Sequence, residues 1–364
     1  MIINQLLVDL KGGSVKLTRR NFVKLVSALG ASAFLTTYKS DIVAALEETK
    51  DYWHIAWLNG GACTGCTISF AQAADPDILQ ILTEILVGNS GMPIVLPDYM
   101  ETIHLASGSL AEEFKERWKR GKAGRRILIV EGAIQDPGYC IIAGKDFREH
   151  VLDAVKYADA IIAVGQCATF GGIPAAKPNP TNAKGLADFL REEGVDKEVI
   201  NLPLCPVNAD QLVVTIAAVV IGAEIELDDY GRPKMFFSTN MHNDLCPYRP
   251  YYDKGQFVEV PGEGEGCKYK IGCKGPITWT DCPLRKWNNG TSYCVEAGAP
   301  CIGCSEPGWP DEFSPFYEEV SNLTSAIIDP TKLGTGIFGA TLAGIGVHAV
   351  RRSLKNKKEV EENE

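Results

Sequence analysis

Seven of the twelve cysteines of this 364-residue chain lie between Cys246 and Cys304, in a stretch rich in glycine and proline. From Cys267 it reads C-K-Y-K-I-G-C-K-G-P-I-T-W-T-D-C-P, and it ends in C-I-G-C at 301–304. Such a segment has few long apolar runs, so it has little hydrophobic core of its own. Thiolates at this density favour iron–sulfur clusters, zinc or copper(I). The stretch therefore predicts an irregular domain held together by metal.

The region before this stretch alternates short apolar runs with helix-like segments. Continuous apolar strands separated by helices indicate a parallel sheet that is covered on both faces. The predicted fold class is therefore α/β, with a flavodoxin-like doubly wound sheet. We expect strands at 54–59, 93–96, 126–130, 160–164 and 198–202, and helices at 78–87, 101–120, 146–157, 183–193 and 209–221.

Four more thiols follow the predicted strands. Cys63 and Cys66 follow the first strand in G-G-A-C-T-G-C, and Cys167 and Cys205 end the fourth and fifth strands. Because the carboxyl ends of parallel strands meet at one edge of a sheet, we expect these thiols to converge there. Either an iron–sulfur cluster or a four-cysteine zinc site would use such a set.

Two further residues follow the third predicted strand. Glu131 ends that strand, where it would either transfer protons or accept backbone N–H bonds. The sequence does not separate these two roles. Cys140 has no partner at a matching spacing, so we interpret it as a buried free cysteine.

Both ends of the chain carry targeting patterns. Arg19 and Arg20 precede an apolar run at 25–37, which predicts a twin-arginine export signal within residues 1–50. A second apolar run at 333–350 would form a helix of about 27 Å, just short of a bilayer core. Five basic residues follow it, which predicts a membrane anchor at 331–352 and a cytoplasmic charged tail at 353–364. The alternatives are an amphipathic cytosolic helix at the start and a buried soluble helix at the end.

The overall charge indicates which partners are excluded, and the predicted export raises the question of whether the cysteines form disulfides. The net charge is −10 and the acidic residues are dispersed, which argues against nucleic acid as a partner. An exported chain with twelve cysteines would alternatively form disulfides. The C-x-x-C pairs with adjacent glycines favour clusters instead.

At these residues the chain resembles the small, electron-transferring subunit of membrane-bound, uptake-type nickel–iron hydrogenases. The resemblance spans about residues 53–317. A related family, the cluster-bearing subunit of NADH:quinone oxidoreductases, shares the sheet domain but not the cysteine-rich end. The matching motifs are C-T-G-C at 63–66, L-P-D-Y-M-E-T at 96–102, V-E-G-A-I at 130–134, G-Q-C-A-T-F-G-G-I-P-A-A-K-P-N-P-T at 165–181 and C-I-G-C-S-E-P at 301–307.

The resemblance implies three iron–sulfur clusters, carried over by motif. The proximal [4Fe–4S] cluster would be held by Cys63, Cys66, Cys167 and Cys205. The distal [4Fe–4S] cluster would be held by His242, Cys246, Cys267 and Cys273. The middle cluster would be held by Cys282, Cys301 and Cys304.

The middle cluster departs from the common family pattern. Many members have a proline seven residues before C-I-G-C and a three-iron middle cluster. This chain has Cys294 at that position. A fourth thiolate there predicts a [4Fe–4S] cluster, whereas a free thiol at Cys294 would leave a [3Fe–4S] cluster.

Three other features of the chain bear on the comparison with the family. Oxygen-tolerant members add two cysteines near the proximal cluster, where this chain has Gly65 and Gly172. We therefore expect an ordinary four-iron cluster and sensitivity to oxygen. Ala62 replaces the glutamate that usually precedes C-T-G-C. His242 is separated from Cys246 by three residues instead of the usual two, so it is the least regular ligand.

The implied activity is that of a hydrogenase whose nickel–iron site lies in a separate large subunit. This chain would relay electrons to a membrane cytochrome b and a quinone-like acceptor, on the outer, periplasmic face of the cell membrane. The implied domains are a flavodoxin-like domain at 51–225 with the proximal cluster, and a cysteine-rich domain at 226–325 with the middle and distal clusters.

Overall fold

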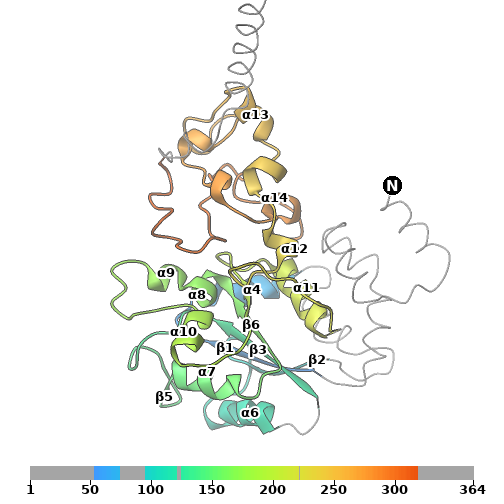
Figure 1. Ribbon diagram of the computed structural model, residues 1–364, viewed down its shortest axis with the longest axis vertical. Helices are drawn as coiled ribbons and strands as arrows, with labels where there is room; N and C mark the ends of the chain where they lie inside the picture. Colours follow the sequence, from blue (N-terminus) through green and yellow to red (C-terminus); the bar gives the residue numbers. More distant parts are fainter. Residues whose placement is uncertain (1–52, 74–94, 121–123, 221, 319–364) are drawn as a thin grey trace, which may run out of the picture. The chain divides into compact units, whose positions relative to one another are not determined.

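The computed structural model describes residues 53–73, 95–120, 124–220 and 222–318. Five strands form one parallel sheet in the spatial order β2-β1-β3-β6-β7 (Figure 1). Numbered along the chain this order is 2-1-3-4-5, which is that of a flavodoxin-like doubly wound sheet. The predicted fold class of the first domain is therefore confirmed. The strands are β1 (Trp53–Asn59), β2 (Val95–Met100), β3 (Arg125–Glu131), β6 (Ala160–Val164) and β7 (Ile200–Leu202).

Both faces of the sheet are buried. Ile127 and Ile129 of β3 belong to one buried cluster, Leu128 and Val130 belong to another, and all four are 0% exposed. Burying each such side chain contributes about 1.5–3 kcal/mol. The first face is covered by α4 (Gly65–Ala71) and α11 (Ala209–Val220), and the second by α6 (Ser109–Arg120), α7 (Phe147–Val155) and α10 (Leu186–Glu192) (Figure 1).

The strand register brings the carboxyl ends of the inner strands to one level. Asn59 is paired with Glu131, Glu131 with Val164, and Val164 with Leu202. The segments that follow β1, β6 and β7 carry Cys63, Cys167 and Cys205. The sheet therefore fixes the points from which these three cysteine-bearing segments start.

Residues 223–318 form only short helices, none longer than five residues. They include α12 (Lys234–Phe237), a π-helical turn η1 (Met241–Leu245), α13 (Arg249–Asp253), η2 (Tyr269–Ile271), η3 (Gly275–Ile277) and α14 (Cys282–Arg285). A small core contains Met241, Tyr293 and Val295 together with Cys246, Cys273 and Cys301. This part is joined to the sheet by Leu204 N donating to Cys304 O (3.2 Å) and by Gln166 Nε2 donating to Glu306 O (2.7 Å).

Three predicted boundaries are wrong. The strand predicted at 93–96 is β2, which continues to Met100; it lies at the sheet edge, where Pro97 is tolerated. The helix predicted from 101 begins only at Ser109, because Gly108 before it takes a left-handed φ of 59°. The helix predicted from 183 begins at Leu186, because Lys184 instead exchanges two backbone hydrogen bonds of 2.9 Å with Ile134.

Several predictions lie outside the described residues. These are the helix at 78–87, the export signal at 1–50, the membrane anchor at 331–352 and the charged tail at 353–364. Of the helices that the structure describes, none has the length and apolar character needed to span a membrane.

Candidate iron–sulfur sites

The turn that carries Cys63 and Cys66 is anchored by Glu131. This carboxylate is 2% exposed and accepts the backbone N–H groups of Cys66 (3.0 Å) and Thr67 (3.2 Å). The Trp57 indole N–H donates to it as well, at 3.0 Å. Of the two roles expected for Glu131, acceptance of backbone N–H bonds is therefore seen directly, and proton transfer stays a prediction.

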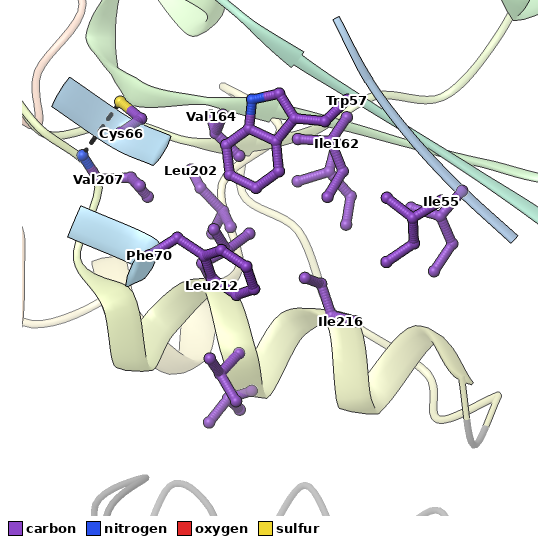
Figure 2. Close-up of a cluster of buried hydrophobic side chains, with 14 of the residues drawn as sticks. Ile55, Trp57, Cys66, Phe70, Ile162, Val164, Leu202, Val207, Leu212 and Ile216 are labelled. Atoms are coloured by element: carbon purple, nitrogen blue, oxygen red, sulfur yellow. Dashed lines mark hydrogen bonds between the residues drawn. The ribbon is translucent and has the colours of Figure 1, made fainter. Parts of the chain in front are cut away.

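The four thiols expected at the sheet edge lie together. Cys66, in α4, belongs to the buried cluster that includes residues of α11 and of the strand ends, and Val207 N donates to its sulfur at 3.4 Å (Figure 2). Burial, together with the neighbouring thiols Cys205 and Cys63, raises the pKa of the Cys167 thiol to about 12. Burial also raises the pKa of Cys66, to which Glu131, Cys167 and Cys205 contribute. Cys63 and Cys205 are exposed, so this group opens to the surface.

Glycines make room for these sulfurs. A Cβ at Gly165 would lie 2.3 Å from the Cys66 sulfur, so no side chain fits there. Gly172 has a left-handed φ of 51°, and a Cβ on it would lie 2.9 Å from the backbone nitrogen of Cys167. A cysteine, or any other side chain, at position 172 would therefore displace Cys167 in this chain.

His242 lies in the π-helical turn η1, where it is 2% exposed. A π-helical turn holds one residue more than an α-helical turn, which accommodates the longer spacing between His242 and Cys246. The Nε2 atom of His242 lies 4.0 Å from the sulfur of Cys267. The irregular spacing noted in the sequence therefore does not separate His242 from the cysteine group.

The other ring nitrogen of His242 is held by Asn243. Arg249 Nη1, which can only donate, lies 2.8 Å from Asn243 Oδ1 and fixes that atom as the amide oxygen. His242 Nδ1 then donates to the same oxygen at 3.1 Å, which leaves Nε2 unprotonated. Burial lowers the pKa of His242, so the imidazole is neutral, which is the form that binds metal.

The thiols expected around His242 are buried with it. Cys246, Cys267 and Cys273 are 8%, 2% and 4% exposed. Burial, with a smaller contribution from Cys246, raises the pKa of Cys267 to about 12 and that of Cys273 to about 11. The structure therefore brings the four predicted distal residues into one group.

Cys294 lies with the three cysteines expected at the middle site. Burial raises the pKa values of Cys282, Cys301 and Cys304, and Cys294 contributes to the rise in all three. The Cys294 side chain is itself exposed. The Thr280 hydroxyl lies 3.3 Å from the Cys282 sulfur. This arrangement favours Cys294 as a fourth member of the set.

The three groups follow one another in space. The backbone N–H of Cys205 bonds to the sulfur of Cys304, which joins the sheet-edge group to the middle group. Cys301 N donates to the Cys273 sulfur at 3.4 Å, which joins the middle group to the group around His242. The order is therefore sheet edge, middle, distal.

The chemistry of these groups fits iron–sulfur clusters. Each group has a sulfur that accepts a backbone N–H bond at 3.4 Å: Cys66, Cys273 and Cys301. Such bonds stabilise thiolates and tune the potentials of clusters. None of the twelve cysteines forms a disulfide, so the disulfide-stapled alternative is wrong for this structure.

Cys140 lies apart from all three groups. It is half-buried and packs against the face of the sheet covered by α7. Burial raises its pKa, to which Glu101 and Asp146 contribute, and no thiol does. Cys140 is therefore a free cysteine, as expected, but it is only half-buried and not fully buried. Within the described residues no three side chains of His, Cys, Asp or Glu are arranged as ligands of a single metal ion.

Comparison with known proteins decides between the two related families. A profile of the C-terminal part of the NiFe/NiFeSe hydrogenase small subunit matches residues 237–317, and one described as NADH ubiquinone oxidoreductase, 20 kDa subunit, matches residues 63–219. The F420 non-reducing hydrogenase II small subunit of Methanosarcina mazei is 39% identical over 94% of this chain and 95% of its own length. The chain belongs to the small-subunit family of nickel–iron hydrogenases.

Other hydrogenase subunits and solved structures agree. The uptake hydrogenase small subunit of Azotobacter vinelandii is 36% identical over 93% of both chains. A chain in the structure of a reduced, active form of the Ni-Fe-Se hydrogenase from Desulfomicrobium baculatum matches with a TM-score of 0.66 and 36% identity, covering 74% of this chain and 100% of that one. As a small subunit, this hydrogenase chain is one part of a heterodimer with a nickel–iron large subunit.

Some residues that contact the groups were not predicted from the sequence. Tyr293 and Thr280 place hydroxyls near the sulfurs of Cys246 and Cys282. The only sequence signal is that each stands one or two residues before a cysteine, which is too weak to identify either. Trp57 gives no signal at all, because its indole reaches Glu131 across two neighbouring strands.

Proposed function

We propose that this chain relays electrons from H2 oxidation in the large subunit through three iron–sulfur clusters. The observation that carries the proposal is the sequence of contacts between the three groups, from the sheet edge through the middle to the distal group. The proposed proximal ligands are Cys63, Cys66, Cys167 and Cys205. The proposed distal ligands are His242, Cys246, Cys267 and Cys273. The proposed middle ligands are Cys282, Cys294, Cys301 and Cys304.

Iron–sulfur clusters, when bound, supply centres that each take up and release one electron. The chain's own residues set the conditions for this. Glu131 holds the backbone of Cys66, and Val207 N donates to its sulfur. The neutral imidazole of His242 would make the distal cluster less negative than four thiolates would. The Cys294 thiolate would complete a four-iron middle cluster.

The open sheet-edge group suggests where the large subunit docks. Cys63 and Cys205 are the exposed members of that group, and Ile68 and Ile173 beside it are 52% and 55% exposed. We propose that this edge is buried against the large subunit, so that the proximal cluster is the first to receive electrons. Two apolar side chains exposed beside a functional group suit a protein interface.

We also propose export and membrane attachment. The twin-arginine pattern at 1–50 and the apolar run with a basic flank at 331–352 are consistent with each other, since both place the folded body on the outer face of the membrane. The Desulfomicrobium baculatum relative is named as periplasmic and that of Azotobacter vinelandii as an uptake hydrogenase. A membrane cytochrome b that passes electrons to a quinone-like carrier is the proposed acceptor.

Purification of the complex with hydrogen-dependent dye reduction tests this function. The chain should co-purify with a nickel-bearing large subunit and reduce a dye under H2. Cys167→Ser should abolish dye reduction, because it removes a proximal ligand. Cys140→Ser is the matched control and should leave dye reduction unchanged. Undiminished dye reduction by Cys167→Ser would contradict the proposal.

A further inference from the structure

Tyr293 lies between two of the three cysteine groups. Its side chain is 3% exposed and packs in the small core with Met241, Cys246, Cys273 and Cys301. In the chain it directly precedes Cys294, a member of the middle group. Tyr293 therefore reaches the distal group with its side chain and the middle group through its backbone.

The hydroxyl oxygen of Tyr293 lies 3.7 Å from the Cys246 sulfur, within the range of a hydrogen bond to sulfur. Within the described part of the chain this hydroxyl makes no other hydrogen bond. A phenol ordinarily ionises only near pH 10, and burial disfavours the charged form. Since a ligating thiolate can only accept, the hydroxyl is the donor.

We propose that Tyr293 tunes the distal cluster by donating this hydrogen bond to the Cys246 thiolate. The inference rests on the proposed function, because it requires a cluster at the distal group. A donor to a ligand sulfur stabilises the reduced, more negative state of a cluster more than the oxidised state. The bond therefore raises the potential of the distal cluster and favours electron transfer to it from the middle cluster. Tyr293 acts through Cys246 and is thus a positioning residue.

Two other hydroxyls in the same part of the chain provide matched comparisons. The Thr280 hydroxyl lies 3.3 Å from the sulfur of Cys282, in the middle group. The Tyr251 hydroxyl instead donates to Glu265 Oε2 at 3.4 Å and contacts no sulfur. Removing the Tyr293 hydroxyl should therefore change the potential of the distal cluster, and removing the Thr280 hydroxyl should change that of the middle cluster. Removing the Tyr251 hydroxyl should change neither potential.

The experiment is a redox titration of the purified heterodimer followed by EPR, with iron content and melting temperature measured for each variant. In Tyr293→Phe the reduced-to-oxidised ratio of the distal cluster at a fixed potential should fall about three- to tenfold, or about 30–60 mV at 59 mV per tenfold change. The middle and proximal clusters should keep their potentials. Thr280→Val should lower only the middle potential, and Tyr251→Phe should change none.

A second variant, for which the distal potential should shift in the opposite direction, separates the effect of the hydrogen bond from a general packing effect. Incorporation of 3-fluorotyrosine at position 293 keeps the ring shape and makes the hydroxyl a stronger donor, so the distal potential should rise. An unchanged distal potential in iron-replete Tyr293→Phe, an equal shift of all three clusters, or loss of the distal cluster alone would overturn the proposal. Failure of the proposed function would appear differently, as the absence of clusters in the unsubstituted heterodimer.

Discussion

Replacement of Cys294 by alanine should convert the middle cluster from four irons to three. Cys294 is grouped with Cys282, Cys301 and Cys304. With three four-iron clusters the chain holds about twelve irons, so the variant should hold about eleven.

The assay is iron quantification of the purified heterodimer combined with EPR of the oxidised protein. Cys294→Ala should lose about one iron per chain and gain the strong signal of an oxidised three-iron cluster. The middle potential should rise, because a three-iron cluster lies at higher potential. Cys140→Ala is the matched control, since Cys140 contacts no other thiol, and it should keep all its iron. If Cys294→Ala kept about twelve irons and gave no three-iron signal, Cys294 would not be a ligand.

Three other perturbations test the supporting structure. Glu131→Gln replaces one acceptor oxygen by an amide group that faces the N–H donors of Cys66 and Thr67, so it should destabilise the fold by about 2–5 kcal/mol. The melting temperature and the proximal EPR signal should fall together. A melting temperature equal to that of the unsubstituted protein would contradict the anchoring role of Glu131. Gly172→Ala should cost about 1–3 kcal/mol and disturb the proximal signal, because a Cβ would meet Cys167 N at 2.9 Å. Gly138 also has a positive φ, of 93°, but a Cβ there would meet open space, so Gly138→Ala should leave the signal intact. Burial, reinforced by Lys115, lowers the pKa of His150, so the neutral imidazole contributes stability that is present above about pH 6.5 and is lost as the pH falls below that value. Between pH 7 and 5.5 the melting temperature of His150→Gln should therefore fall less than that of the unsubstituted protein. Equal falls in the two proteins would contradict this role of His150.

The sheet and its thiols were predictable because their causes are local. Apolar runs of strand length separated by helical segments specify a parallel sheet, and the C-T-G-C and G-Q-C motifs directly follow two of its strands. Once the strand ends align, as Asn59, Glu131 and Val164 do, the thiols converge without further information. The errors are at boundaries such as Gly108 and Lys184, where a left-handed glycine or an isolated pair of backbone bonds shortens a helix.

For the cysteine-rich part, the composition predicted only that its structure is irregular, and the grouping of its ligands came from the resemblance to the family. No periodic pattern exists in residues 223–318, because none of its helices exceeds five residues. The π-helical turn around His242 and the contact between Tyr293 and Cys246 arise from tertiary packing. Partners 47 residues apart, as Tyr293 and Cys246 are, leave no mark in a single sequence.

The most direct test of the central claim is metal and sulfide analysis with Mössbauer spectroscopy on the intact, unsubstituted heterodimer. We predict about twelve irons and about twelve acid-labile sulfides in this chain, all in three four-iron clusters, with nickel confined to the large subunit. Zinc in place of iron, or cysteines paired as disulfides, would contradict the electron relay. About eleven irons with a three-iron centre would contradict the assignment of Cys294 alone.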